Sequence, residues 1–244
     1  RPAAQQQERG AMTRPRRSDS PRERLLQAAR DVVTAEGLEG LTLRAIARQA
    51  GVSHGAPLRH FPSLAALLAA AAADGFARLI ATIDTRLTEA QRAAEAAGAE
   101  LDPRRRLAVA GEAYVQFALD DPGVFSMMFR PERVDVSDPD YQTQGYRSFH
   151  QLVDLVAGAQ ADGWQRDHRP ETLAAVLWAN VHGLAVLMVH GALPAVVGDD
   201  AAHLPALSTL LVLGIEPLPV PAPAPVPDPA AVPVPDPDLQ GDPR

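Results

Sequence analysis

The sequence contains no cysteine and no lysine, so all 23 of its basic side chains are arginines. The missing cysteine excludes a disulfide framework, a thiolate zinc site and a cysteine nucleophile. The most apolar runs, 64–73 and 184–197, are too short to span a bilayer or are interrupted by His190 and Pro194. The basic N-terminus lacks the apolar stretch of a signal peptide. We therefore expect a soluble, cytoplasmic protein that has no membrane partner.

Sequence patterns of catalysis and metal binding are also scarce. The chain has neither a phosphate-binding glycine loop nor a metalloprotease motif. His182 and His190 are eight positions apart, which is too far for a two-histidine metal clip on one helical turn. We therefore expect a protein that is not an enzyme, with no metal site and no cofactor.

Charge is distributed unevenly along the chain. Residues 1–60 carry eleven arginines and six acidic residues, a net charge of +5, whereas the remainder carries twelve arginines and twenty-four acidic residues, a net charge of −12. A basic module on an acidic body is the asymmetry expected when only one end of a protein meets nucleic-acid phosphates.

Residues 41–61 carry the clearest motif, LTLRAIARQAGVSHGAPLRHF. The spacing predicts two short helices around a glycine turn at Gly51, with Ser53 capping the second helix. This is the pattern of a helix-turn-helix, whose second helix lies in the DNA major groove. The residues expected to face DNA are Thr42, Arg44, Ser53, His54, Gly55, Ala56, Leu58, Arg59 and His60.

Different roles are expected within this set. Gly55 permits close approach to the bases, Ala56 can touch a thymine methyl group, and His54 can contact a base or a phosphate. Thr42 and Arg44 are placed for phosphate contacts. The alternative for these two residues is that Thr42 is only a helix cap and Arg44 only a solvated surface residue.

The rest of the chain has helical periodicity and no alternating strand pattern, which predicts an all-α fold. The longer expected helices span about 20–36, 63–97, 104–120, 141–165, 172–189 and 204–213, with a short segment at 124–129. We divide the chain into a disordered basic arm (1–19), a helix-turn-helix DNA-binding domain (20–65), a helical ligand-binding and dimerisation domain (66–215) and a disordered proline-rich tail (216–244). Eleven of the 23 prolines lie from residue 217 onward, a composition that cannot bury a core.

Aromatic and methionine side chains in the body indicate a mostly apolar ligand pocket. The candidate lining residues are Tyr114, Phe117, Met127, Met128, Phe149, Val153, Trp178 and His182. The alternative for each of them is ordinary core packing, because core residues have the same helical spacing.

The sequence resembles the TetR/AcrR family of transcriptional regulators. The resemblance is carried by Thr42–Ala47, Ala50–Ser53 and Arg59–Ser63, and in the C-terminal half by Trp178–Leu184, which is similar to a subgroup with a Trp-His-Gly-type ligand domain. It implies an all-helical homodimer that binds double-stranded operator DNA and a small-molecule effector. The helices at 172–189 and 204–213 would form the dimer interface.

Two positions depart from the family pattern. Leu58 stands where an aromatic residue, commonly tyrosine, is usual, and Leu64 stands where lysine is usual. Both family residues commonly hold the DNA backbone. We therefore expect a weaker phosphate grip, for which the arginines of the arm are candidates to compensate.

The sequence thus favours a ligand-responsive repressor that a small molecule releases from its operator. An activator or a corepressor-dependent regulator is the nearest alternative. A small-molecule-binding or enzymatic helical protein that does not bind DNA is a second alternative, and an adaptor acting through the proline-rich tail is a third.

Overall fold

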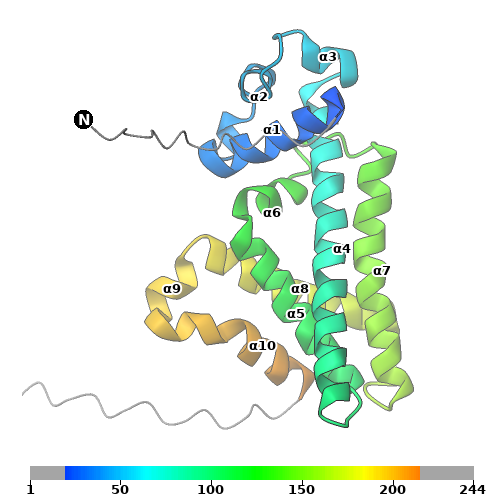
Figure 1. The fold of residues 1–244 in the computed structure, drawn as a ribbon. Coiled ribbons are helices and arrows are strands. Elements are labelled where there is room, and N and C mark those ends of the chain that lie inside the picture. The colour runs from blue at the N-terminus through cyan, green and yellow to red at the C-terminus, as the bar shows by residue number, and fades with distance from the viewer. Residues whose placement is uncertain (1–19, 215–244) are drawn as a thin grey trace, which may run out of the picture.

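The computed structural model describes residues 20–214, which form helices joined by short connections (Figure 1). The basic arm (1–19) and the proline-rich tail (216–244) lie outside the described residues. The elements are α1 (Pro21–Glu36), η1 (Leu38–Gly40), α2 (Leu43–Gln49), α3 (Ala56–His60), α4 (Leu64–Ala96), α5 (Pro103–Asp120), α6 (Pro122–Met128), α7 (Pro139–Ala161), α8 (Pro170–Val189), α9 (Ala192–Val197), η2 (Gly198–His203) and α10 (Leu204–Leu213). No strand occurs between residues 20 and 214, so the all-α class is confirmed.

Helices α1 to α3 form a small unit at one end of the long helix α4 (Figure 1). α1 begins with a capping box, in which the Glu23 amide donates to Ser20 Oγ at 3.2 Å and the Ser20 amide donates to Glu23 Oε2 at 2.6 Å. Leu25 of α1, Ile46 of α2 and Phe61 after α3 are buried in the core of this unit. These buried side chains hold the three helices together, and the opposite faces of α2 and α3 are exposed to solvent.

The start of α3 corrects one expectation. Ser53 does not cap the helix; the N-cap is Gly55, and no side chain caps it. With Ser53 as the cap, the first helical hydrogen bond to its carbonyl would have to come from position 57, which is a proline without an N–H. The Ser53 carbonyl instead accepts from the Ala56 amide at 2.9 Å, and Pro57 falls in the first helical turn.

Helix α4 connects this unit to the body. Ser63 caps it by accepting from the Ala66 amide at 3.1 Å, as the sequence predicts. Its 33 residues extend about 50 Å at 1.5 Å per residue. The alanines at 69–73 are buried and their small side chains allow close packing, with α5 and α7 the main neighbours of α4. α4 and α7 run side by side along the body (Figure 1).

Several helix boundaries differ from the expected ones, most clearly those of α7 and α8. α7 begins at Pro139 rather than at Tyr141, because Asp138 Oδ1 accepts from the amides of Asp140 and Tyr141 at 3.0 and 2.9 Å. α7 ends at Ala161 rather than near Gln165, since Gly163 and Gln165 have φ angles of +104° and +47°. α8 likewise begins two residues early, with Pro170 in its first turn.

The segment between α8 and α10 was not predicted to be helical, but it forms α9 and η2. Pro194 lies in the first turn of α9, where it needs no amide hydrogen, so it does not break the helix. α10 then packs against α5 and α8.

Two described helices, α4 and α8, are long and apolar enough to cross a membrane by length and composition alone. The most apolar window of α4 is 61% buried, as expected for the core helix of a folded domain, but that of α8 is only 22% buried. Large apolar side chains are exposed on α8 and α10, among them Val176, Leu187, Leu207 and Val212. A single chain therefore leaves an uncovered apolar face on these two helices.

Candidate functional site

The helix-turn-helix presents most of the residues expected to face DNA to solvent. Eight of the nine are exposed, and Ala56 is half-buried. Leu58 is 55% exposed, so the leucine is not part of the hydrophobic core. Thr42 is exposed and also caps α2, since its Oγ1 accepts from the Ala45 amide at 3.1 Å.

Arg44 and Arg59 differ from Arg48 in their charge partners. Neither Arg44 nor Arg59 forms an ion pair within residues 20–214, whereas Arg48 lies 3.6 Å from Glu36. The guanidinium of Arg22 lies 5.1 Å from the centre of the Phe61 ring, which holds it beside α3. Unpaired guanidinium groups on an exposed face can bind phosphate without first breaking a salt bridge.

Residues 51–55 spell Gly-x-Ser-x-Gly, the letters of the nucleophile elbow of α/β-hydrolases. That elbow needs a strand leading into the serine. Here α2 precedes Ser53, and the described part of the chain has no strand. The segment is the turn of the helix-turn-helix.

The body contains a cavity of about 300 Å³ between α4, α5, α7, α8 and α10. Tyr114, Phe149 and Trp178, three of the eight predicted pocket residues, line it. Phe117, Met127, Met128 and Val153 are buried outside the lining. These four have the helical spacing of the pocket residues but face neighbouring helices.

His182 lies behind the cavity wall. Its Nδ1 is 2.8 Å from Tyr114 Oη, and Trp178 Nε1 donates to the same Tyr114 oxygen at 3.2 Å. The imidazole ring is also 4.6 Å from the Phe129 ring, centre to centre. Burial lowers the pKa of His182 and raises the pKa of Tyr114 above their ordinary values, so both side chains stay uncharged near neutral pH. His182 therefore holds a cavity-lining phenol in place.

Several lining residues were not predicted from the sequence, notably Phe76, Phe129, Tyr141 and Gln151. The sequence offers one clue to Gln151, because it is a polar residue beside the apolar positions of the helix that carries Phe149. Phe76 gave none, since it is one apolar residue in a long apolar helix. Within residues 20–214, no group of three or more His, Cys, Asp or Glu side chains is arranged to hold a metal ion.

Two family models match the sequence. Residues 25–71 match the model described as bacterial regulatory proteins of the tetR family, and residues 107–209 match the tetracyclin repressor-like C-terminal domain. A solved structure of a protein of unknown function from Rhodococcus sp. RHA1 is 32% identical, with 82% of this chain and 99% of that chain covered and a TM-score of 0.66. The chain belongs to the TetR family.

Further solved structures agree with this assignment. A transcriptional regulator from Rhodococcus sp. RHA1 is 26% identical, with 82% of this chain and all (100%) of that chain covered and a TM-score of 0.56. The fatty acid degradation regulator FadR from Bacillus halodurans, at 13% identity, 81% and 97% coverage and a TM-score of 0.59, shares the fold. A search of curated proteins gave no match. The fold and the matched domains are those of a DNA-binding transcriptional regulator.

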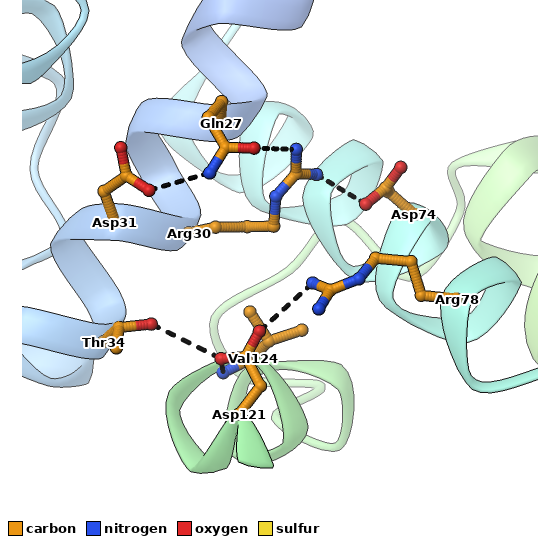
Figure 2. Close-up of polar contacts among 8 residues, drawn as sticks. All are labelled: Gln27, Arg30, Asp31, Thr34, Asp74, Arg78, Asp121 and Val124. Carbon is orange, nitrogen blue, oxygen red and sulfur yellow. Dashed lines mark hydrogen bonds and ion pairs between the residues drawn. The ribbon is translucent and has the colours of Figure 1, made fainter. Parts of the chain in front are cut away.

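In this TetR-family chain, hydrogen bonds and ion pairs join the helix-turn-helix unit to the body, as Figure 2 shows. We call them the polar clasp; its members are Gln27, Arg30 and Thr34 of α1, Asp74 and Arg78 of α4, and Asp121 at the start of α6. Arg30 Nη1 lies 2.5 Å from Asp74 Oδ2, and Arg30 Nη2 donates to Gln27 Oε1 at 2.6 Å. This half of the clasp fixes α1 against α4.

Asp121 organises the other half of the clasp. Its Oδ2 accepts from Arg78 Nη1 at 3.1 Å, and its Oδ1 accepts from Thr34 Oγ1 at 3.3 Å. Asp121 is also the N-cap of α6, where Oδ1 accepts from the Val124 amide at 3.4 Å. One carboxylate therefore contacts α1, α4 and α6 together.

Proposed function

We propose that this chain is a ligand-responsive transcriptional repressor that a small molecule releases from its operator. The supporting observation is that one turn of α4 serves both the cavity and the clasp. Asp74 and Arg78 are four residues apart and share the clasp face, whereas Phe76, two residues from each, lines the cavity on the other side of the helix. A ligand that moves this turn also moves the groups that hold α1.

On this proposal, α3 enters the major groove and the turn before it approaches the base edges. His54, Gly55 and Ala56 are assigned to base or nearby phosphate contacts, and Thr42, Arg44 and His60 to phosphates. Ser53, Leu58 and Arg59 complete the proposed contact surface. The exposure of this face supports the assignment, as does the lack of an acidic partner for Arg44 and Arg59 between residues 20 and 214.

The cavity is assigned to the effector. Tyr114, Phe149 and Trp178 would contact it directly, and His182 would act through Tyr114. Release requires the effector to bind one arrangement of α4 more tightly than the other, because equal affinity for both shifts no equilibrium.

The dimer interface is assigned to the apolar face of α8 and α10. Val176 is 58% exposed and Leu187 46% exposed on α8, and burying such side chains against a second copy removes apolar surface from water. A two-fold dimer would place two α3 helices about 34–36 Å apart, the spacing of successive major grooves on one side of DNA. We expect such a regulator to act in the cytoplasm.

A DNA-binding titration tests the proposal. The full chain is titrated against a labelled duplex taken from upstream of its own coding sequence, at several salt concentrations, with a scrambled duplex as control. Sequence-selective binding that weakens as salt rises supports the proposal. Absence of binding at low salt to any upstream segment overturns it.

A further inference from the structure

The wall of the cavity is uncharged and mostly apolar. None of the side chains that line it carries a charge, and most of its wall is aromatic or aliphatic. A carboxylate or phosphate entering it would lose its hydration and find no arginine to pair with. An uncharged ligand avoids this cost.

Two of the lining hydroxyl groups donate their protons to backbone carbonyls. Tyr141 donates to the Met128 carbonyl at 3.1 Å, and Thr209 donates to the Pro205 carbonyl at 2.6 Å. Tyr114 Oη accepts from Trp178 Nε1 and lies 2.8 Å from His182 Nδ1, where the tautomer of the ring decides which atom donates. Toward the cavity the oxygens of Tyr141 and Thr209 therefore retain only lone pairs, so these two are acceptors.

Gln151 on α7 adds a third acceptor. Its Nε2 donates to Asp84 Oδ1 at 2.7 Å and to the Ile80 carbonyl at 3.3 Å, and because both partners can only accept, they fix which end of the amide is nitrogen. Its Oε1 is buried and has no hydrogen-bond partner among the described residues. A buried acceptor without a donor is costly, and a ligand donor would relieve that cost.

Two other polar side chains line the cavity, and neither is charged. Asn180 Oδ1 accepts from Ser208 Oγ at 3.1 Å, which leaves its amide N–H groups as the lining donors together with the Ser148 hydroxyl. The balance of the lining is therefore toward acceptors. A volume of about 300 Å³ is at the small end of ligand pockets and suits a compact ring system.

We propose that the cavity binds an uncharged aromatic molecule that carries at least one O–H or N–H donor, a phenol- or indole-like compound, and discriminates against carboxylates. The ligand donor pairs with Gln151 Oε1, and its rings pack against Phe76, Phe149 and Trp178. This inference rests on the assignment of the cavity as the effector site, and it adds the chemical class of the effector.

Three probes of similar shape test it with the full chain by isothermal titration calorimetry: 2-naphthol, 2-methoxynaphthalene and 2-naphthoate. We expect 2-naphthol to bind about tenfold more tightly than its methyl ether, which has no donor. We expect 2-naphthoate to bind more weakly than 2-naphthol by at least the same factor. Equal affinity for all three, or a preference for the carboxylate, overturns the inference.

A pair of variants on α7 locates the donor contact. Gln151→Met removes Oε1 at similar side-chain volume, and we expect it to reduce the preference for 2-naphthol over the ether to about twofold or less. Gln144→Met is the matched control, because Gln144 Oε1 is also buried without a partner among the described residues but Gln144 does not line the cavity. The control should keep the full preference; loss of preference in both variants, or in neither, contradicts the assignment to Gln151.

The outcome also separates this inference from the proposed function. If none of the probes binds while the chain still binds its upstream DNA, the ligand class is wrong and the DNA-binding regulator stands. If 2-naphthol binds selectively but leaves the DNA complex intact at saturation, the cavity chemistry is right and release by ligand is wrong.

Discussion

Gly123 lies where α6 of the body packs directly against the backbone of α1. It lies in the first turn of α6, and a Cβ atom built there would be 2.8 Å from the Val33 carbonyl oxygen, 2.9 Å from the Val33 carbonyl carbon and 3.1 Å from the Thr34 amide nitrogen. All three neighbours are backbone atoms of α1, which cannot rotate away as a side chain can. Gly123→Ala must therefore push α6 and α1 apart.

The size of the effect follows from these distances. Carbon–oxygen and carbon–carbon contacts normally lie at about 3.3–4.0 Å, so a gap of roughly 0.5–1 Å must open. Overpacking of this kind costs about 1–3 kcal/mol, and the helix-propensity gain of alanine over glycine offsets at most about 1 kcal/mol. We expect a net loss of about 1–2 kcal/mol, together with loss of the 3.3 Å hydrogen bond from Thr34 to Asp121.

Thermal unfolding at a fixed protein concentration measures this effect. At about 2–4 °C per kcal/mol for a chain of this size, Gly123→Ala should lower Tm by about 2–8 °C. Gly158→Ala on α7 is the control, because a Cβ there meets nothing within 4 Å, and it should raise stability by about 0.5–1 kcal/mol. A Gly123→Ala variant that melts at or above the wild-type temperature would refute the close approach of α6 to α1.

Three further predictions concern DNA, pH and assembly. Arg44→Ala should weaken binding to all sequences alike and lower the salt slope by about 1 per protomer, as measured by fluorescence anisotropy. Burial lowers the pKa of His182 in the folded chain, so the unfolded chain takes up that proton first as pH falls. The free energy of unfolding should therefore decrease as the pH is lowered from about 6.5. His182→Asn, whose amide oxygen can accept from Tyr114, should flatten that slope in urea unfolding; an unchanged slope would assign it to other groups. Val176→Glu should shift the dimer toward monomer in light scattering, whereas Val136→Glu, at an exposed valine outside α8 and α10, should not.

Local chemistry made most of the fold predictable. The Ser20 capping box and the Ser63 cap locate the starts of α1 and α4 from a few residues each, and helical periodicity locates the faces that pack. The start of α3 was missed because the capping preference of Ser53 was given more weight than the missing amide hydrogen of Pro57. That error concerned one hydrogen bond and did not affect the assignment of the helix-turn-helix.

The cavity was only partly predictable, for a physical reason. Periodicity identifies the buried face of a helix but does not say whether that face meets another helix or an unfilled space. Met127 and Phe149 show the same pattern in sequence, yet only Phe149 lines the cavity. The clasp was not predicted at all, because Arg30, Asp74 and Asp121 are far apart in sequence and resemble ordinary surface charges until the fold brings them together.

The free energy contributed by the polar clasp is the energy that a ligand would have to overcome to rearrange it. The Arg30–Asp74 and Arg78–Asp121 pairs each have one partner about 40% exposed, and such partly exposed pairs contribute roughly 0.2–1 kcal/mol each. Together they provide about 0.4–2 kcal/mol, which overlaps the range of typical allosteric coupling energies, about 1–3 kcal/mol. A buried ion-pair network would be too costly to break for a ligand held by a few hydrogen bonds and ring contacts. If the proposed release by a ligand is right, the energy needed to rearrange the clasp is within what binding in a cavity of about 300 Å³ can supply.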